Sequence, residues 1–305
     1  MKTVAMFAGQ GAQAVGMGRD LADALPVCRE LFDRAGEALG YDLASVCFEG
    51  PIERLTRTDV CQPAIFVMSA ACLAAVRERH PDFAFDYAAG LSLGEWTALY
   101  AAGVVGFEQC VRILEARGRF MQEACDERPG TMVCLLRLAP EKVAEICAAS
   151  GATMANINSA EQIVLSGSPE ACADAARLAA EAGGRAVPLT VAGAYHSPFM
   201  EPAARALAEV LAKEEFRTPS VPVLSNVTGR PHAPDADSIR QAMVDQVTHP
   251  VRWLDTVTWL RTPEADAGRF VEFGPGKTLS GLVKRIDRAA TAQNVDGLAA
   301  VDALP

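Results

Sequence analysis

The chain has 305 residues, enough for one large domain or two smaller ones, and half of them are hydrophobic, which is ordinary for a globular protein with a substantial core. A formal net charge of −10 argues against a nucleic-acid partner, because binding to a phosphate backbone needs a basic patch. No run approaches the ~20 apolar residues that cross a bilayer, and the N-terminal run AMFA is too short for a signal peptide, so we expect no membrane partner.

In the first part of the chain, apolar β-like runs alternate with helical stretches rich in alanine and leucine, which is typical of an α/β protein. The first two strands are expected to end at glycine-rich turns, at Gly9-Gln10-Gly11 and just before Ser92. The predicted elements are a strand over 3–8, a long buried helix over 62–79, a strand over 84–90, and helices over 96–105 and 107–124.

The last of these helices carries an arginine on an otherwise apolar face. The residues Cys110, Leu114, Arg117 and Met121 recur at i, i+4, i+7 and i+11, which places them on one side of a helix. A buried guanidinium is costly unless an anion or another acceptor meets it. Arg117 is therefore predicted either to bind a substrate carboxylate, which a guanidinium can do bidentately, or to form a structural ion pair with an acid such as Glu95.

From residue 128 to 195 the elements follow the order strand, helix, strand, strand, helix, strand, which is the ferredoxin-like pattern. We expect this stretch, 128–195, to be a small subdomain inserted into a larger domain of residues 1–127 and 196–305. The predicted elements of the insert are strands over 131–138, 153–159, 162–167 and 185–191 and helices over 140–150 and 169–183. The larger domain is expected to resume with a helix over 200–214, a strand over 221–226, a helix over 236–247 and a strand over 269–274.

The clearest local motif is Gly90-Leu91-Ser92-Leu93-Gly94, because G-x-S-x-G between a strand and a helix forms a nucleophile elbow. Its glycines allow a turn tight enough to expose the serine hydroxyl, and the helix N-terminus behind it offers free N–H groups to an oxyanion. The Leu93 amide is one candidate donor, and the Gly9-Gln10-Gly11 loop is the candidate for the second. The competing interpretations are a plain glycine-rich turn and, at the earlier loop, a phosphate-binding turn, which lacks the third glycine of G-x-G-x-x-G.

A serine nucleophile needs a base, and the chain has four histidines. His80, in the charged stretch RERHPD, and His232, in the loop GRPHAPDAD, are expected at the surface, and His249 precedes a proline in a turn. His196 follows a predicted strand and precedes a predicted helix, where α/β enzymes place site residues. By elimination it is the predicted base, and the competing interpretation is a hydrogen-bonded turn histidine.

The nine cysteines are scattered singly, and no CxxC pair occurs. This use of cysteine is typical of reduced thiols in a cytoplasmic enzyme, where most of them are small core residues. No metal-ligand spacing is present, so we predict no metal site.

Seven motifs run through nearly the whole chain: FAGQGAQ, GLSLGE, ARGRFMQEA, GAYHSPFM, SNVTGRP, HPVRW and EFGPGKTLSGL. Together they resemble the malonyl-CoA:acyl carrier protein transacylases of fatty-acid synthesis. They also resemble the acyltransferase domains and free-standing, trans-acting acyltransferases of polyketide synthases. The resemblance implies a large α/β-hydrolase-like domain with an inserted ferredoxin-like subdomain, and an active site in the cleft between them.

The resemblance also implies roles for individual residues. Ser92 would be the nucleophile, and His196 the general base and acid. The N–H groups of Gln10 and Leu93 would form the oxyanion hole, and Arg117 would bind the acyl carboxylate.

Two glutamines match family positions as well. Gln246, in MVDQVTHPVRW, matches the residue whose backbone carbonyl orients the catalytic histidine, so that the family uses a Ser–His dyad without an aspartate. Gln62, in CQPAIF, matches a glutamine near the site.

Two pocket residues bear on the acyl group. The family usually has a histidine before the serine, where it helps to hold the acyl carboxylate, whereas this chain has Leu91, which points to a bulkier or less polar extender. In polyketide acyltransferases an aromatic residue at the position of Tyr195 accompanies malonyl, since it fills the space that an α-methyl group would need. Together with Arg117, Tyr195 favours a malonyl group.

By this resemblance the chain is expected to move a malonyl or related carboxylated acyl group from malonyl-CoA to the phosphopantetheine thiol of an acyl carrier protein, with no permanently bound cofactor. Leu91 and the motifs SNVTGRP and GAYHSPFM favour a trans-acting polyketide enzyme over a fatty-acid transacylase. One alternative is an editing hydrolase of stalled acyl groups, against which Arg117 argues. The order of Ser92 and His196 by itself would also allow an ordinary α/β-hydrolase esterase, which the downstream motifs exclude. The intact Ser92, His196 and Arg117 argue against a carrier-docking scaffold with a decayed site.

Overall fold

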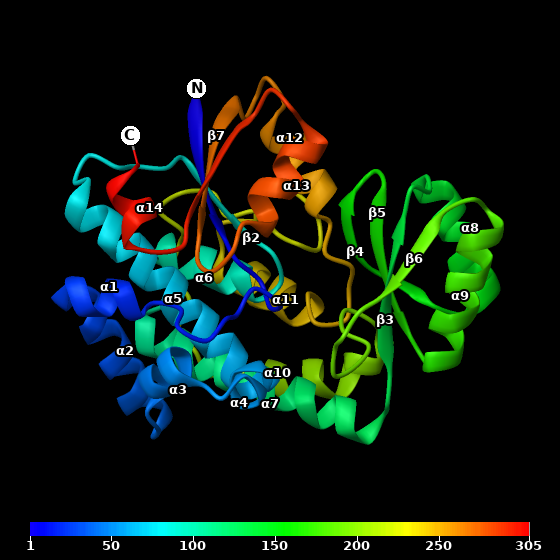
Figure 1. Cartoon of the computed structure of the whole chain (residues 1–305), viewed down its shortest axis with the longest axis horizontal. Helices are drawn as coiled ribbons and strands as arrows, with labels where there is room; N and C mark the ends of the chain where they lie inside the picture. The colour runs from blue at the N-terminus through cyan, green and yellow to red at the C-terminus, as the bar shows by residue number, and fades with distance from the viewer. Residues whose placement is uncertain (305) are drawn as a thin grey trace.

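The chain folds around two separate four-stranded sheets, as the computed structural model of residues 1–304 shows (Figure 1). The first sheet has the strand order β2-β1-β7-β8, and all of its pairings are parallel. Its strands are β1 (Lys2–Phe7), β2 (Tyr87–Gly90), β7 (Ala267–Phe273) and β8 (Thr291–Val295). Parallel strands need long crossover connections, and here most of the helices of the chain lie in them.

The helices of this larger unit precede and follow a stretch of strands and helices that forms the second unit. Before it come α1 (Arg19–Ala24), α2 (Pro26–Leu39), α3 (Leu43–Glu49), α4 (Ile52–Thr56), α5 (Thr58–Arg79), α6 (Leu93–Ala101) and α7 (Phe107–Glu127). After it come the 3₁₀ turn η1 (Pro198–Met200), α10 (Glu201–Leu211), α11 (Ala236–Asp245), α12 (Trp253–Leu260), α13 (Thr278–Ile286) and α14 (Leu298–Asp302).

Side chains of β1 alternate between two hydrophobic cores, one on each face of the first sheet. Ala5 and Phe7 join the larger core, which includes the apolar sides of α5, α6 and α7. Val4 and Met6 join a smaller core with α12 and α13. The period of two along a strand therefore buries β1 on both faces, as expected for the centre of a parallel sheet.

The second sheet is antiparallel, with the strand order β4-β5-β3-β6. Its elements in chain order are β3 (Thr131–Leu136), α8 (Pro140–Ser150), β4 (Thr153–Ser159), β5 (Gln162–Gly167), α9 (Pro169–Glu181) and β6 (Arg185–Pro188). Both helices lie on the face turned away from the larger unit (Figure 1). This βαββαβ order with helices on one face is the ferredoxin-like arrangement.

The strands of this second sheet also divide their side chains between two environments. On β3, Val133 and Leu135 pack into the small core with α8 and α9, whereas Met132 and Cys134 join the core of the larger unit. One face of the sheet is thus closed by its own helices. The other face is left to meet the larger unit.

One helix in the described chain, α5, is long and apolar enough to cross a membrane by length and composition, contrary to the expectation from sequence that no run approaches that length. In the structure 89% of its most apolar window is buried. It lies at the centre of the larger core, so its apolar character is explained by packing.

A predicted strand over 221–226 is wrong: the structure has only isolated bridges there, Ala88 with Val223 and Leu224 with Pro231. The Pro222 carbonyl accepts from the Ala88 amide (3.1 Å), and the Leu224 amide donates to the Ala88 carbonyl (2.9 Å). Pro222 has no N–H of its own, which limits the pairing with β2 at this edge of the sheet. The strand β8 and the helices α1 to α4 and α12 to α14 were not predicted.

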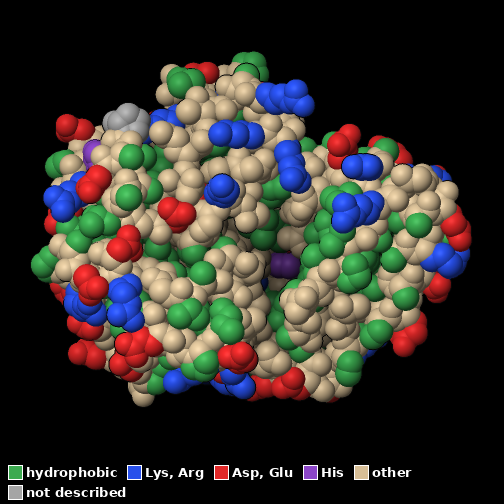
Figure 2. All heavy atoms as spheres, viewed as in Figure 1, with side chains coloured by type: hydrophobic (Ala, Val, Ile, Leu, Met, Phe, Trp, Pro, Cys, Tyr) green, Lys and Arg blue, Asp and Glu red, His purple; other side chains and the backbone are tan. Residues whose placement is uncertain are grey.

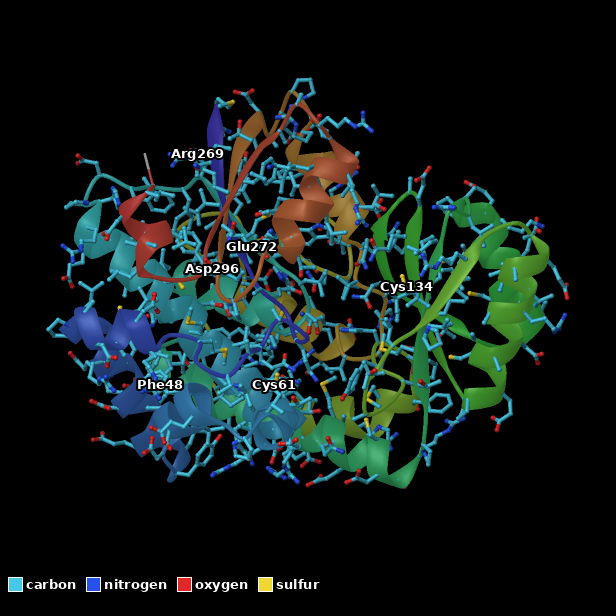
Figure 3. All side chains as sticks on the ribbon, in the orientation of Figure 1. Phe48, Cys61, Cys134, Arg269, Glu272 and Asp296 are labelled. Carbon is cyan, nitrogen blue, oxygen red and sulfur yellow. The ribbon has the colours of Figure 1, made fainter. Side chains whose placement is uncertain are left out.

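A buried glutamate fixes α13 to the first sheet. Glu272, which is labelled in Figure 3, lies on β7. Its carboxylate accepts hydrogen bonds from the amides of Leu279 (3.0 Å) and Ser280 (2.7 Å) in the first turn of α13. These amides have no partners inside the helix, so the carboxylate satisfies them and lies at the positive end of the helix dipole. Burial raises the pKa of Glu272 above its usual value, and the same amides oppose that rise.

A glycine on α7 lets this helix approach α5 closely. A Cβ atom at Gly118 would lie 2.4 Å from the carbonyl oxygen of Thr58 and 2.8 Å from the Cα of Asp59, both of them backbone atoms. Since backbone cannot rotate away, only glycine permits this contact. The next residue back along α7 is Arg117, so the close approach also brings that guanidinium to α5.

We predict that Gly118→Ala destabilises the protein by about 1–3 kcal/mol, because the methyl group would force α7 and α5 apart. Gly281→Ala is the matched control, since Gly281 also lies in a helix and its Cβ would meet nothing within 4 Å. That control is expected to stabilise by about 0.5–1 kcal/mol, through helix propensity. Urea unfolding of both variants measures the difference, and equal effects would contradict the steric explanation.

Candidate active site

Between the two units lies a cavity of about 440 Å³ that is lined from both sides. The larger unit contributes Gln10, Ser92 and Leu282, and the second sheet contributes Asn156. Part of the segment 189–196, in which the chain returns to the larger unit, forms a further wall. Figure 2 shows the hollow from outside, with a histidine side chain at its floor.

Ser92 lies at the turn between β2 and α6 in a conformation that L-residues rarely adopt, with φ 56° and ψ −108°. The two flanking glycines make this turn possible. A Cβ at Gly90 would lie 2.1 Å from the carbonyl group of Gly94, and one at Gly94 would lie 2.2 Å from the carbonyl oxygen of Phe7. The turn is therefore packed directly against the end of β1, and it directs the Ser92 hydroxyl into the cavity.

The Ser92 hydroxyl contacts one histidine. The distance from Ser92 Oγ to His196 Nε2 is 2.9 Å, and His196 Nδ1 lies 2.8 Å from the backbone carbonyl of Gln246. A carbonyl can only accept, so Nδ1 carries the proton and Nε2 is left to accept one from the serine. Burial and, after it, the nearby charge of Arg117 together lower the pKa of His196 to about 4. The imidazole is thus neutral at neutral pH and able to act as a base.

Arg117 is 1% exposed, and its guanidinium is held by neutral groups. Nη1 donates to Gln62 Oε1 (2.7 Å), and Nη2 donates to Gln246 Oε1 (3.0 Å) and to Ser92 Oγ (3.1 Å). Its Nε has no hydrogen-bond partner among residues 1–304. Burial lowers the pKa of Arg117 to about 10, partly opposed by the charge of Glu95, so the group is still a cation at neutral pH.

The competing interpretation, a direct ion pair between Arg117 and Glu95, is wrong, because the side chain of Gln246 lies between them. A buried cation that contacts only neutral acceptors retains most of its attraction for an anion. The arrangement therefore provides a place for a carboxylate beside the serine hydroxyl.

The two candidate oxyanion donors lie on neighbouring loops. Leu93 is the first residue of α6, and Gln10 lies in the loop after β1 and lines the cavity. The loops touch, because a Cβ at Gly9 would lie 2.6 Å from the carbonyl oxygen of Leu91. Within residues 1–304 neither the Gln10 amide nor the Leu93 amide donates to a protein acceptor, so both could donate to a substrate oxygen.

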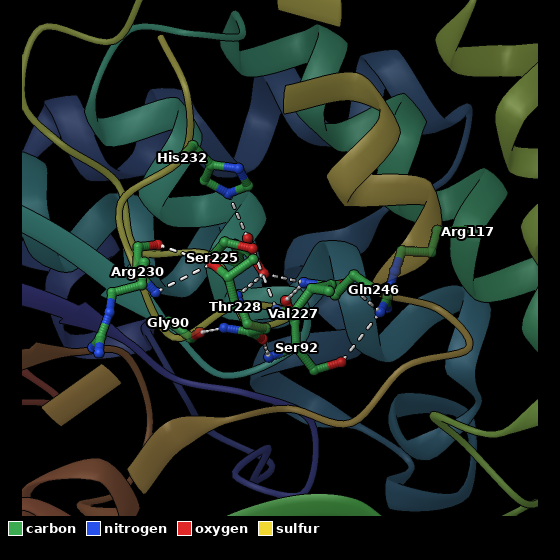
Figure 4. Close-up of polar contacts among 11 residues, drawn as sticks. Gly90, Ser92, Arg117, Ser225, Val227, Thr228, Arg230, His232 and Gln246 are labelled. Carbon is green, nitrogen blue, oxygen red and sulfur yellow. Dashed lines mark hydrogen bonds and ion pairs between the residues drawn. The ribbon is translucent and has the colours of Figure 1, made fainter. Parts of the chain in front are cut away.

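An asparagine that sequence reasoning missed holds the turn at Ser92. Asn226 Oδ1 accepts from the Ser92 amide (2.7 Å), and Asn226 Nδ2 donates to the Gly90 carbonyl (2.7 Å; Figure 4). One side chain therefore clamps both ends of the strained turn. The available signal was the SNVTGRP motif, in which this asparagine lies, but the motif does not say what the side chain contacts.

The predicted surface position of His232 is also wrong. Its side chain is 2% exposed, and Nε2 lies 2.6 Å from Glu95 Oε1 (Figure 4). The loop composition of GRPHAPDAD suggested solvent, but composition reports the average surroundings of a segment and not the direction of one side chain. The other oxygen of Glu95 accepts from Gln246 Nε2 (2.6 Å), so His232 belongs to the same buried network as the site.

The other two histidines contact main-chain carbonyls away from Ser92. His80 is half-buried, and its Nε2 lies 2.8 Å from the Val301 carbonyl, so its predicted solvation is only partial. His249 is exposed, and its Nδ1 lies 2.8 Å from the Asp245 carbonyl. Of the histidines, His196 alone contacts Ser92 in the described chain.

The pocket residues singled out from the sequence lie around the same cavity. Tyr195 is 6% exposed, lines the cavity, and its hydroxyl lies 3.0 Å from Thr58 Oγ1. Leu91 also lines it and packs against the smaller core. Gln62 is fully buried behind Arg117, and its Nε2 contacts the Met121 sulfur (3.5 Å). Burial raises the pKa of Tyr195, so its hydroxyl stays protonated.

All nine cysteines are free thiols, and eight of them are buried. Figure 3 shows two of them, Cys61 in the larger unit and Cys134 in the second sheet. Among residues 1–304 no cluster of three or more histidine, cysteine, aspartate or glutamate side chains is placed to hold a metal ion.

Comparison with known proteins adds a family to this geometry. Residues 4–296 match the model of the acyl transferase domain family. The malonyl CoA-acyl carrier protein transacylase of Escherichia coli (strain K12) is 41% identical over 292 residues, which are 94% of this chain and 93% of that protein.

Solved structures agree with this match over the full length. The malonyl CoA-acyl carrier protein transacylase of Clostridium perfringens superimposes with a TM-score of 0.94 at 38% identity, covering 99% of this chain and 95% of that one. The malonyl-transacylase PlMCAT, solved in complex with the type II polyketide acyl carrier protein AntF, gives a TM-score of 0.95 at 38% identity and covers 99% and 98%. These likenesses confirm the predicted fold class.

We predict that the reactivity of Ser92 toward an acyl thioester persists well below pH 6.5 and falls only as the pH approaches 4. The reason is that the neutral form of His196 is required, and its pKa is lowered to about 4. The measurement is kcat/KM against pH with acetyl-CoA, whose acyl group has no carboxyl that would titrate. Arg117→Leu should move the acidic limb to higher pH, because the Arg117 charge is one cause of the lowered pKa. A limb near pH 6.5 in the unaltered protein would contradict this account.

Proposed function

This chain belongs to the acyl transferase domain family, and on that basis we propose that it is an [acyl-carrier-protein] S-malonyltransferase that works through an ester on Ser92. The observation that carries the proposal is the double contact of the Ser92 hydroxyl, 2.9 Å from His196 Nε2 and 3.1 Å from Arg117 Nη2. A base and a buried cation thus meet at one nucleophile. The first can activate it, and the second can select a donor that carries a carboxylate.

In the first half-reaction, His196 takes the proton of Ser92 while Oγ attacks the thioester carbon of malonyl-CoA. The negative charge on the tetrahedral intermediate is stabilised by the amides of Gln10 and Leu93. The carbon–sulfur bond then breaks, the CoA thiolate leaves with the proton from His196, and malonyl-Ser92 remains. The Gln246 carbonyl keeps the ring of His196 in the tautomer that this step needs.

In the second half-reaction, the phosphopantetheine thiol of an acyl carrier protein enters the same cavity and gives its proton to His196. Its sulfur attacks the malonyl ester, and Ser92 leaves with the proton returned by His196. The two substrates use one site in turn, so the kinetics are ping-pong. Water must stay away from the ester during the exchange, and the burial of His196 and Arg117 beneath the cavity favours this.

The malonyl carboxylate is proposed to take the free donor capacity of Arg117. In the unliganded site Nε has no partner and Nη2 is shared between a neutral amide and the serine, so a carboxylate would be the strongest acceptor available to them. Leu91 occupies the position where the family usually has a histidine. Arg117 is therefore proposed to bind the negatively charged carboxylate of the acyl group without help from a residue at that position. Tyr195 borders the cavity and reduces the room for an α-substituent.

We propose a role in polyketide biosynthesis, as a free-standing, trans-acting acyltransferase. Leu91 and the motifs SNVTGRP and GAYHSPFM favour this pathway, and one structural neighbour is a transacylase in complex with a polyketide carrier protein. The same chemistry would serve fatty-acid synthesis. The ratio of kcat/KM for a type II polyketide carrier and a fatty-acid carrier distinguishes the two, and preference for the fatty-acid carrier would overturn this assignment.

The charge around the cavity suits an acidic carrier protein. Although the chain has a net charge of −10, Lys and Arg side chains gather over α12 and α13 along the rim of the hollow in Figure 2. Three of the exposed basic residues belong to α13 or precede it directly: Lys277, Lys284 and Arg285. Leu282 of the same helix lines the cavity.

A cytoplasmic location is proposed as well, in line with the nine free thiols.

The first test is the acyl-enzyme itself. The protein is incubated with malonyl-, methylmalonyl-, ethylmalonyl- and acetyl-CoA, and the intact mass is recorded. A malonyl adduct is expected on the unaltered protein and none on Ser92→Ala, because the ester needs Oγ. Transfer to a carrier protein should exceed hydrolysis. An adduct that persists in Ser92→Ala would refute the nucleophile, and faster hydrolysis than transfer would identify an editing hydrolase.

The second test concerns the selectivity of Arg117. Arg117→Ala is predicted to lower the rate of acylation by malonyl-CoA by about 10- to 100-fold more than that by acetyl-CoA, since a hydrogen bond to a charged group contributes about 1.5–3 kcal/mol. The two rates are measured by rapid quench on the same preparation. An equal loss for both donors would mean that Arg117 has only a structural role.

A further inference from the structure

Glu95 is a buried carboxylate that takes no direct part in the proposed reaction. It lies in the first turn of α6, three residues after Ser92, and is 1% exposed. Oε2 accepts hydrogen bonds from Gln246 Nε2 (2.6 Å) and from the Asn226 amide (3.1 Å). Oε1 lies 2.6 Å from His232 Nε2. Burying a charge is costly, so these donors are what keeps the carboxylate in place.

The first consequence of this carboxylate is the orientation of the Gln246 amide. Gln246 Nε2 donates to two acceptors, Glu95 Oε2 and the Ser92 carbonyl (2.9 Å). Its Oε1 accepts from Arg117 Nη2 (3.0 Å). A flipped amide would turn its NH₂ group toward the guanidinium and its oxygen toward two other oxygens. Glu95 therefore determines which end of Gln246 faces Arg117.

His232 is the donor to Glu95 that comes from outside the site. It lies beyond the turn closed by the Leu224–Pro231 bridge, and its own amide donates to the Val223 carbonyl (2.8 Å). The side chain reaches inward from this loop and is 2% exposed (Figure 4). Its Nε2 can donate to Glu95 whether the ring is neutral or protonated.

We propose that His232 is a positioning residue for acyl selection: it donates to Glu95, Glu95 orients the Gln246 amide, and that amide sets the Arg117 guanidinium. The proposal deepens the malonyltransferase function and rests on it. His232 is 137 residues away from Glu95 in the sequence. Three successive hydrogen bonds, of 2.6, 2.6 and 3.0 Å, connect it through Glu95 and Gln246 to Arg117, the cation beside the serine hydroxyl.

The proposal assigns different roles to the backbone and to the side chain of Gln246. Its backbone carbonyl holds His196 Nδ1, whereas its side chain holds Arg117. Loss of the His232 contact should disturb the side chain of Gln246. The backbone carbonyl of Gln246 should stay in place, because the end of α11 holds it. The transfer of acyl groups without a carboxylate should therefore suffer less than malonyl transfer.

The test compares His232→Leu, which fills a similar volume without a donor, with His232→Gln, whose amide nitrogen reaches about as far as Nε2. The acylation rates of Ser92 by malonyl-CoA and acetyl-CoA are measured for each. His232→Leu is expected to lower the malonyl-to-acetyl ratio about tenfold, the size of one charge-assisted hydrogen bond, and His232→Gln to keep it within about twofold. His80→Leu is the matched control, because His80 also bonds through Nε2 but to the distant Val301 carbonyl, and its ratio should not change.

An equal fall of both rates in His232→Leu, or an unchanged ratio, overturns the proposal. If His232→Leu does not fold, His232→Met is used in its place. The methionine side chain has no N–H that could donate to Glu95, so this variant should lower the same ratio.

A crystal structure tests the positioning role of His232 separately from the proposed malonyltransferase function. In the crystal structure of His232→Leu the contact between Gln246 Oε1 and Arg117 Nη2 should be lost, whereas it should persist in His232→Gln. Intact geometry in His232→Leu overturns the positioning role even if the enzyme is active. Absence of an acyl adduct from the unaltered protein overturns the proposed function, while the crystal structures still decide the role of His232.

Discussion

The buried charge of Arg117 is the constraint on which the site depends. A guanidinium that is 1% exposed would be unstable beside apolar residues alone, and here Gln62, Gln246 and Ser92 each give it an acceptor. Burial lowers the pKa of His196, the same charge lowers it as well, and the imidazole therefore stays neutral. One interaction thus links the cation proposed to select the acyl group to the base proposed to activate the serine.

The two sheets contribute to the site in different ways. The parallel sheet holds the strained turn at Ser92, because Gly90 lets the end of β2 turn closely onto the start of α6, and Gly94 lets α6 begin against the end of β1. The antiparallel sheet closes one face with its own helices and turns the other toward the cavity, where Asn156 lies. A cleft between a rigid elbow and an opposing sheet can admit a long, thin substrate arm and still keep the reacting atoms buried.

The polar network around Ser92 also shows how a strained turn is stabilised. Ser92 and His196 both have positive φ, which costs free energy for residues with a side chain. Asn226 holds the turn by its amide and carbonyl groups, and Glu95 holds Asn226 in turn. His232 lies at the outer end of these contacts, so a loop without any contact to the cavity is connected to its chemistry.

The sequence by itself determined what local rules govern: the alternation of strands and helices, the elbow at Ser92, the apolar helix face that carries Arg117, and the elements 140–150, 153–159 and 162–167, whose ends agree with the structure. Turn chemistry and periodicity act between residues that are near in sequence, so they can be read without a structure. Only the tertiary structure decided that Gln246 separates Arg117 from Glu95, that Asn226 clamps the turn, and that His232 points inward. These are contacts between residues more than 100 positions apart in the sequence, and their geometry depends on how whole elements pack.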